Sequence, residues 1–261
     1  MPGILYDSIV YGPVNSRRFG ISLGINVLPE NSKVCSFDCI YCEVGWNSDF
    51  PSNHSNQQFH AREDIYHSLK ERLIDLKERH MIPDNITFSG NGEPTMHPEF
   101  SNIVEDIKKI RDQYVPDTHI TVLSNSTTLN NKSVFDTLLH IENNIMKLDA
   151  GSENMFRLIN QPVDNIHIED IVENLKKFNG KLFIQSMFLR GEHRGEPIDN
   201  TTKEEVQKWL DHIKAINPKG VLLYSIDRAT PNHTIEKVQY EELERIADQV
   251  RHLGIEANSF S

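Results

Sequence analysis

Lys33-Val-Cys-Ser-Phe-Asp-Cys-Ile-Tyr-Cys-Glu43 is the stretch around which the rest of the sequence can be interpreted. It places Cys35, Cys39 and Cys42 in a C-x3-C-x2-C pattern, and the chain contains no other cysteine. Cysteine thiolates bind soft metals and iron–sulfur clusters, and a short loop can direct three of them at one centre. Three ligands are one fewer than a closed zinc site or a closed cluster requires. The pattern therefore predicts a metal centre with one coordination position open for chemistry.

Length and composition indicate an ordinary globular protein. The 261 residues are 38% hydrophobic and 25% charged, and no segment has the composition of a domain linker. We therefore expect one domain over residues 1–261, with a metal-binding loop over residues 29–60. No apolar run approaches the ~20 residues that are needed to cross a bilayer, so no membrane association is expected.

The clustering of the cysteines bears on the cellular location of the protein, and its net charge bears on the kind of partner that it binds. Three clustered cysteines form no disulfide framework, and the first seven residues do not resemble a signal peptide, so a cytoplasmic location is expected. The chain has 27 Lys and Arg against 38 Asp and Glu, a formal net charge of -11. Nucleic-acid binders usually present a basic surface to the phosphates. The charge disfavours a nucleic-acid partner, although a local basic patch would still permit one.

Short apolar segments alternate along the chain with segments of helical periodicity. The expected strands cover residues 19–28, 85–90, 119–124, 144–149, 181–188 and 221–226. Between them, apolar residues recur at three- and four-residue spacing, as in Ile65, Leu69 and Leu73, and a last helix is expected over residues 240–253. This alternation predicts an α/β fold with parallel strands, in a barrel or a doubly wound sheet. Six strands are fewer than the eight of a closed barrel.

Parallel folds of this kind carry their reactive groups at the carboxyl ends of the strands. The residues that follow the expected strands should therefore lie together at one rim. They are the cysteine loop, residues 90–94, Ser124 and Asn125, Lys147 and Asp149, residues 190–196, and Asp227 with Arg228.

Several motifs together resemble the radical S-adenosylmethionine (radical SAM) superfamily. Tyr41 precedes the last cysteine of the loop, and Gly92-Glu93-Pro94 follows the second expected strand, in the order typical of that superfamily. Residues 11–20, 89–95 and 226–231 resemble its group of iron–sulfur oxidoreductases that includes the wyosine-base synthases. The resemblance covers nearly the whole chain and implies a partial (βα)6 radical SAM barrel.

The resemblance also implies a chemistry. Cys35, Cys39 and Cys42 would hold a 4Fe-4S cluster, and S-adenosylmethionine would bind the open iron through its amino and carboxylate groups. An electron from the reduced cluster, supplied by an external donor such as flavodoxin or ferredoxin, would cleave a C–S bond. The resulting 5′-deoxyadenosyl radical would abstract hydrogen from a substrate that the sequence does not identify.

A set of residues is expected to bind the cofactors. The glycines of the Gly90–Pro94 turn would let backbone carbonyls approach the ammonium group, and Asn91 stands where many members carry glycine. Lys147 suits a carboxylate and Asp149 suits ribose hydroxyls, unless they form only a strand-end ion pair. The expected cofactor residues are Tyr41, Gly90, Asn91, Gly92, Glu93, Pro94, Ser124, Asn125, Lys147, Asp149, Gln185, Met187, Tyr224 and Ser225. The last four could equally fill the barrel interior.

Charged residues near the strand ends are the candidates for binding substrate. Arginine recognises carboxylate and phosphate with two parallel hydrogen bonds. The candidates are Arg17, Arg18, Arg190, Glu192, Arg194, Asp227 and Arg228. The alternative is that these loops are simply solvated.

Other functions fit parts of the pattern. A Cys3His zinc site could use His54 or His60, although closed zinc sites usually pair two ligand motifs. Modification of a tRNA base is disfavoured by the acidic charge and by the lack of the second cysteine set that wyosine-type relatives carry. Modification of a peptide or protein, including glycyl-radical activation, remains open, as does small-molecule chemistry. The alternative from another class is a metal or redox scaffold that catalyses nothing.

Overall fold

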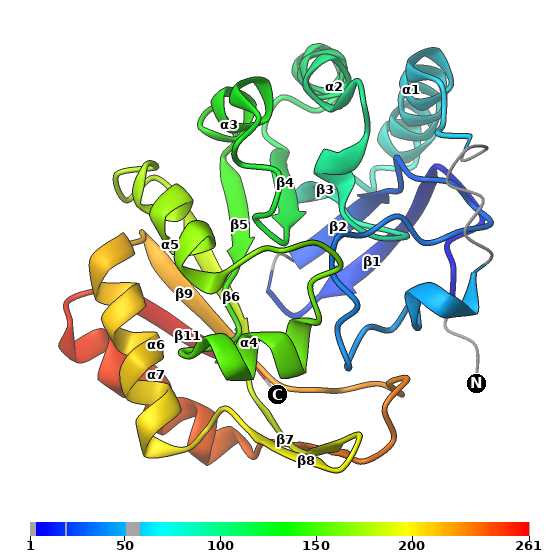
Figure 1. Ribbon diagram of the computed structural model, residues 1–261. Coiled ribbons are helices and arrows are strands. Elements are labelled where there is room, and N and C mark those ends of the chain that lie inside the picture. Colours follow the sequence, from blue (N-terminus) through cyan, green and yellow to red (C-terminus); the bar gives the residue numbers. More distant parts are fainter. Residues whose placement is uncertain (1–3, 19, 51–57, 261) are drawn as a thin grey trace.

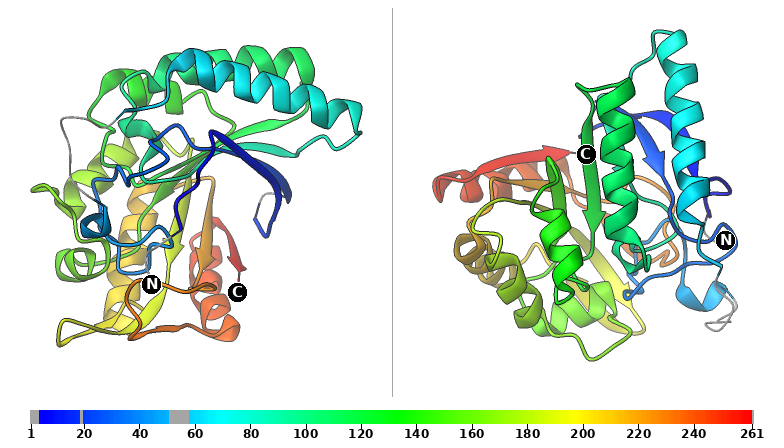
Figure 2. Two further views of the ribbon diagram at one scale, coloured as in Figure 1. Left: turned by 90° about the vertical axis from the view of Figure 1, so that its right-hand side faces the viewer. Right: turned by 90° about the horizontal axis from the view of Figure 1, so that it is seen from above.

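A curved parallel sheet with helices on its convex side forms the body of the protein (Figures 1 and 2). The computed structural model describes residues 4–18, 20–50 and 58–260. Within these residues one sheet has the strand order β1-β2-β3-β4-β5-β6-β9-β11. Its strands are β1 (Val10–Ser16), β2 (Gly20–Ile25), β3 (Asn85–Phe88), β4 (His119–Ser124), β5 (Asn143–Lys147), β6 (Phe183–Met187), β9 (Gly220–Tyr224) and β11 (Glu256–Phe260). Neighbouring strands pair in parallel, except that β1 is antiparallel to β2.

Amphipathic helices cover the convex side of the sheet because each carries one apolar stripe. They are α1 (Arg62–Glu78), α2 (Phe100–Tyr114), α3 (Lys132–Leu138), α5 (Ile168–Lys176), α6 (Lys203–Ile216) and α7 (Tyr240–His252). In α1 the predicted stripe of Ile65, Leu69 and Leu73 is fully buried. Burying each of these side chains contributes about 1.5–3 kcal/mol, and this burial holds the helix to the sheet. Among the described helices, none is both long and apolar enough to cross a membrane.

The predicted fold class, a partial barrel of alternating strands and helices with a parallel sheet, is confirmed. All six expected strands are present, with β2 described from Gly20 because Phe19 lies outside the described residues. The structure adds the parallel strand β11 and the antiparallel strand β1, one at each edge of the sheet. The loop expected over residues 29–60 contains a short helix, η1 (Asn47–Asp49), and residues 51–57 lie outside the described residues.

Two further elements lie near the carboxyl ends of the strands (Figure 1). One is the helix α4 (Glu153–Asn160), between β5 and α5. The other is a small antiparallel sheet of β7 (Leu189–His193), β8 (Glu196–Asp199) and β10 (Ile235–Lys237), in the order β10-β7-β8. Asn232, just before β10, donates its backbone N–H to Ile40 O at 3.3 Å, which places this sheet beside the cysteine loop.

Candidate functional site

The beginning of the cysteine loop is bound to the Gly90–Pro94 turn. Val34 N–H donates to Asn91 O at 2.9 Å, and Glu93 N–H donates to Val34 O at 2.9 Å. Gly92 makes this approach possible: its φ is +135°, and a Cβ there would lie 1.9 Å from Val34 O. Only glycine fits such a contact without displacing the backbone. The two motifs that were recognised separately in the sequence therefore form one backbone-paired unit.

The middle of the loop is held by the carboxyl end of α4. Asp38 N–H donates to Asn160 O at 3.0 Å, and Ile40 N–H donates to Ile159 O at 3.0 Å. The side chain of Gln161 also donates a hydrogen bond from Nε2 to Asp38 O at 2.9 Å. The last carbonyls of a helix lack partners within the helix, so the loop satisfies groups that would otherwise need water. The backbone on both sides of Cys39 is thereby fixed.

The thiols of Cys35 and Cys39 lie in an environment that disfavours negative charge unless cations accompany it. Cys39 is 7% exposed. Burial, together with the neighbouring Cys39 thiol, raises the pKa of Cys35 to about 12. Burial raises the pKa of Cys39 to about 11. Thiolates are nevertheless the metal-binding form, and the positive charge of a metal centre is what makes buried thiolates favourable.

Two amide groups point at the sulfurs. Asn125 Nδ2 lies 3.6 Å from Cys35 Sγ, and Asn160 Nδ2 lies 3.5 Å from Cys39 Sγ. Both asparagines are buried. Hydrogen bonds to cysteine sulfur are one of the features that tune an iron–sulfur cluster.

Two lysines, the buried Lys33 and the partly buried Lys147, add positive charge around the thiols. Lys33 Nζ donates to Gly45 O at 2.7 Å and to Asp38 Oδ1 at 3.2 Å. Burial is the largest single influence and opposes its charge, but the Cys42, Cys35 and Cys39 thiols and Asp38 together raise the pKa of Lys33. For Lys147, burial likewise opposes the charge and Asp149 raises the pKa above its usual range. Both lysines therefore remain cationic.

Three thiols with amide donors beside two of them suit an iron–sulfur cluster. Over residues 4–18, 20–50 and 58–260, no three His, Cys, Asp or Glu side chains lie close enough to ligate one ion. A cluster binds each thiolate through a different iron, so its sulfurs are farther apart than around one ion. His60, a zinc candidate, lies 4.0 Å from Glu30 Oε1 through its Nε2 atom. His54, the other candidate, lies outside the described residues.

Tyr41, Lys147 and Asp149 form a buried network beside Cys39. Lys147 Nζ donates to the Tyr41 hydroxyl at 2.6 Å, and that hydroxyl donates to Asp149 Oδ2. The Asp149 side chain is 0% exposed and also accepts from Met187 N at 2.9 Å and from Asn160 Nδ2 at 2.7 Å. Lys147 Nζ lies 3.5 Å from Asp149 Oδ2. The residues that were expected to bind the cofactor are thus adjacent to a cysteine of the loop.

Gln185 and Tyr224 lie on the concave side of the sheet and meet Arg18. Gln185 is in register with Lys147 on the neighbouring strand, and its Nε2 donates to the Tyr224 hydroxyl at 2.9 Å. Arg18, from the turn between β1 and β2, donates to Gln185 Oε1, and its guanidinium lies 4.9 Å from the Tyr224 ring centre. Burial lowers the pKa of Arg18. This arginine therefore reaches from one edge of the sheet to strands near the other edge.

Several expected cofactor residues use their side chains inside the fold. Asn91 is 0% exposed, and its amide bonds the backbone of Tyr6 and Pro29. Glu93 accepts from Thr95 and from Asn125 N, and burial raises its pKa. The other side-chain contacts are Ser124 Oγ with Ser126 N and Ser225 Oγ with Phe188 O and Val238 N. Met187 bonds Asp149 through its backbone N–H, and Pro94 begins η2 (Pro94–Met96). The side-chain contacts of Asn91, Glu93, Ser124 and Ser225 indicate positioning rather than direct contact with a ligand.

The other substrate candidates do not converge on one point. Arg17 pairs with Asp227 at 3.3 Å, and Arg228 pairs with Glu43 at 2.7 Å, both at exposed positions. Arg190 is bound to Glu242 at 2.6 Å and to Thr201 at 2.7 Å, which ties β7 to α7. Glu192 and Arg194 are exposed on the β7–β8 hairpin. Arg18 is the member of this set that contacts Gln185 and Tyr224 on the concave side.

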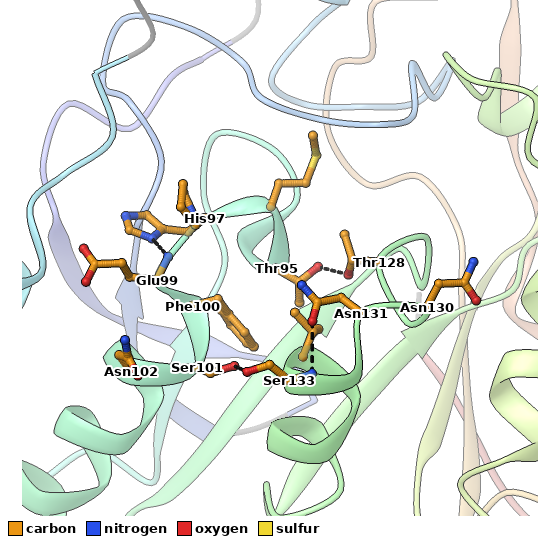
Figure 3. Close-up of a pocket in the computed structure, with 13 residues that line it drawn as sticks. Thr95, His97, Glu99, Phe100, Ser101, Asn102, Thr128, Asn130, Asn131 and Ser133 are labelled. Carbon is orange, nitrogen blue, oxygen red and sulfur yellow. Dashed lines mark hydrogen bonds between the residues drawn. The ribbon is translucent and has the colours of Figure 1, made fainter.

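A pocket of about 440 Å³ lies behind the Gly90–Pro94 turn, between the amino ends of α2 and α3 (Figure 3). Thr95 lines it, and the Thr95 hydroxyl bonds both Glu93 Oε1 and the Thr128 hydroxyl. Ser101 and Ser133 are hydrogen-bonded to each other on its wall. No thiol lines this pocket.

Two residues near the thiols were not singled out from the sequence. Lys33 is the residue two positions before Cys35, and a lysine so close to a thiol motif could have been noted as a charge partner. Asn160 follows Ser152, Met155, Phe156 and Ile159, whose helical spacing was the available sign of α4. Only the fold shows that the end of this helix meets Cys39, because 121 residues separate them along the chain.

Two proteins from other organisms are similar in sequence to most of this chain. It is 30% identical over 92% of its length to a UPF0026 protein of Methanocaldococcus jannaschii, of which it covers 70%. It is 32% identical over 90% of its length to a protein of Brachyspira hyodysenteriae named GTPase Obg. The chain spans about a third of that longer protein, with 32% of it covered.

Solved structures and a family profile agree with the fold and with the cysteine motif. A radical SAM methyltransferase from Sphaerobacter thermophilus superposes with a TM-score of 0.67 at 13% identity, covering 92% of this chain and 65% of the other. SuiB from Streptococcus suis, solved with S-adenosylmethionine bound, gives 0.63 at 13% identity, covering 91% and 50%. The profile of the radical SAM superfamily matches residues 32–200, which include all three cysteines. The chain therefore belongs to the radical SAM superfamily, and is an enzyme of the class that uses a 4Fe-4S cluster and S-adenosylmethionine.

Proposed function

We propose that Cys35, Cys39 and Cys42 hold a 4Fe-4S cluster that reductively cleaves S-adenosylmethionine, so that a 5′-deoxyadenosyl radical removes hydrogen from a substrate. The observation that carries the proposal is the position of the loop. Val34, directly before Cys35, is paired by its backbone to the Gly90–Pro94 turn at the carboxyl ends of the strands, where parallel folds place their chemistry. The three thiols, the two amides that point at them and the two nearby lysines also support the assignment of a cluster to this loop.

The protein's own part is to orient groups and exclude water. We assign Lys147 to the carboxylate of S-adenosylmethionine, Asp149 to its ribose, and the carbonyls of Gly90 and Gly92 to its ammonium group. Tyr41 bonds both Lys147 and Asp149, so the two charges are aligned before a ligand arrives. Charges held in a buried site act more strongly than the same charges in water. Asn91, Glu93, Ser124 and Ser225 are assigned positioning roles, because each is engaged with the backbone.

The substrate-facing role is assigned to Arg18. It contacts Gln185 and Tyr224 on the concave side of the sheet, next to Lys147. A guanidinium in this place would recognise an anionic or polar substrate group. An external one-electron donor such as flavodoxin or ferredoxin is proposed to supply the electron. Peptide, protein and tRNA-base substrates differ from small molecules in size, and no contact described above selects among them.

Anaerobic turnover tests the proposal. The protein is reconstituted with iron and sulfide, reduced with dithionite and mixed with S-adenosylmethionine, and 5′-deoxyadenosine is measured. We expect 5′-deoxyadenosine from the wild type and none from Cys39→Ala, which lacks one ligand of the cluster. Lys147→Met should load the cluster but bind S-adenosylmethionine more weakly. A loaded wild-type cluster that yields no 5′-deoxyadenosine would contradict the reaction and favour a binding or redox-sensing role.

A further inference from the structure

Asn160 connects a cysteine of the loop to the carboxylate of Asp149. Its single amide nitrogen lies 3.5 Å from Cys39 Sγ and 2.7 Å from Asp149 Oδ2. A side-chain amide has two N–H donors, so one can point at the sulfur while the other points at the carboxylate. The residue is 1% exposed, and water does not compete for either bond.

The backbone of Asn160 fixes this geometry. Its carbonyl accepts from Asp38 N at 3.0 Å, directly before Cys39, and α4 ends at this residue. The side chain and the loop that it contacts are therefore held by the same residue. Gln161, which follows in a left-handed conformation with a φ of +42°, closes the helix and bonds Asp38 O. A residue fixed at both its backbone and its amide cannot easily change its distance from the sulfur.

The chemistry of the two partners gives this bridge a consequence. The Asp149 carboxylate lies near Cys39, because the amide nitrogen of Asn160 contacts both groups. Adding an electron to a cluster makes the sulfurs more negative, so a nearby carboxylate opposes reduction and an N–H donor favours it. Asn160 supplies a donor to the sulfur and at the same time a donor to the carboxylate. Both bonds favour the reduced cluster.

We propose that Asn160 is a positioning residue that raises the reduction potential of the cluster through its hydrogen bond to Cys39 and its bond to Asp149. The inference rests on the proposed function, since it requires Cys39 to be a cluster ligand. Asn125 makes a comparable contact with Cys35 at 3.6 Å, but it also bonds Ser36 and Thr127, so its loss would alter the loop itself. A substitution at Asn160 therefore tests the hydrogen bond to sulfur with less change to the loop.

An EPR-monitored redox titration without S-adenosylmethionine measures the effect. Asn160→Leu keeps the size of the side chain but removes both donors, and Asn160→Asp replaces the amide by a second carboxylate. At a given potential, we expect Asn160→Leu to lower the ratio of reduced to oxidised cluster about tenfold, which corresponds to a fall of 59 mV in the reduction potential of a one-electron couple. Asn160→Asp should lower that ratio further. If Asn160→Leu does not retain a cluster, Asn160→Ser, which keeps one hydroxyl donor, should show a smaller shift in the same direction.

Asn200 provides the matched control. It is also a buried asparagine beside Asp149, and its Nδ2 donates to the backbone oxygens of Asp149 at 2.7 Å and Met187 at 2.8 Å rather than to sulfur. Asn200→Leu should destabilise the protein without moving the potential. An unchanged potential in the Asn160 variants, or an equal shift in Asn200→Leu, overturns the inference. A wild-type protein that loads no cluster refutes the proposed function instead, so the two failures are distinguishable by iron and sulfide content.

Discussion

Asn91, in the Gly90–Pro94 turn, shows how a residue that is expected to bind a cofactor can act for stability. Its amide donates to Tyr6 O and Pro29 O, each at 2.8 Å, and accepts from Tyr6 N at 2.8 Å. These bonds join the N-terminal segment, the start of the cysteine loop and the turn after β3. The sequence position predicted contact with a cofactor, because the resemblance places glycine there in many relatives. Tyr6 lies 85 residues away, so the sequence offered no sign of its role.

Asn91→Gly, which restores the residue common in relatives, should therefore destabilise this protein. The change leaves the carbonyl of Pro29, whose bond is buried, and the partly buried carbonyl and N–H of Tyr6 without these partners, which we expect to lower the free energy of unfolding by about 3 kcal/mol. Urea denaturation of the cluster-free protein measures it. Asn91→Ala should lose a similar amount, which attributes the effect to the amide rather than to glycine flexibility. An unchanged denaturation midpoint in both variants would contradict this account.

At the scale of elements, the buried inner strands could be predicted from the sequence, whereas the strands at the edges could not. The inner strands β4 and β9 contain mainly apolar runs, because helices cover one face of the sheet and each strand is paired on both edges. β11 was missed because it is an edge strand whose sequence, Glu256-Ala-Asn-Ser-Phe260, has few branched apolar residues. β1 was missed because Pro13 and Gly12 argue against a strand, and an edge position tolerates proline.

The joint between η2 and α2 gives a pH-dependent prediction. His97 is buried, its Nδ1 accepts from Glu99 N at 3.0 Å, and its Nε2 bonds His60 O at 3.0 Å. Burial lowers the pKa of His97 below its usual value of 6.5. The unfolded chain therefore binds a proton more readily than the folded protein, and the stability that neutral His97 contributes is lost as the pH falls below about 6.5.

His97→Asn isolates this contribution, because the Asn oxygen can still accept from Glu99 N while the titrating ring is gone. Urea midpoints at pH 7.5 and pH 5.5 should differ less for the variant than for the wild type. At pH 7.5 the variant is expected to be the less stable protein, since it loses the bond to His60 O and the contact with Phe59, whose ring centre lies 5.2 Å away. Equal losses on acidification would show that His97 is not the titrating group.

Over the whole molecule, the open barrel leaves two sheet edges, β1 and β11, that no strand joins within the described residues. Two side chains of the turn between β1 and β2 bridge this opening, one on the concave side of the sheet and one at the surface. Arg18 contacts Gln185 of β6 and Tyr224 of β9 on the concave side, and Arg17 pairs with Asp227 at the surface. We infer that the inner contact contributes more to holding the edges in place, because water weakens the outer one.

Adjacent substitutions in this turn measure the difference. Arg18→Ala removes a hydrogen bond from a charged donor and a cation–π contact, and should lower the free energy of unfolding by about 2 kcal/mol. Arg17→Ala removes an ion pair whose side chains are 46% and 45% exposed, and should cost less than about 1 kcal/mol. Arg18→Lys keeps the charge but not the planar donor fork, so an intermediate loss is expected. Because both variants alter the same turn, any general loosening of that turn affects them equally. Similar urea midpoints for the two alanine variants would therefore show that the inner contact does not hold the edges of the open barrel.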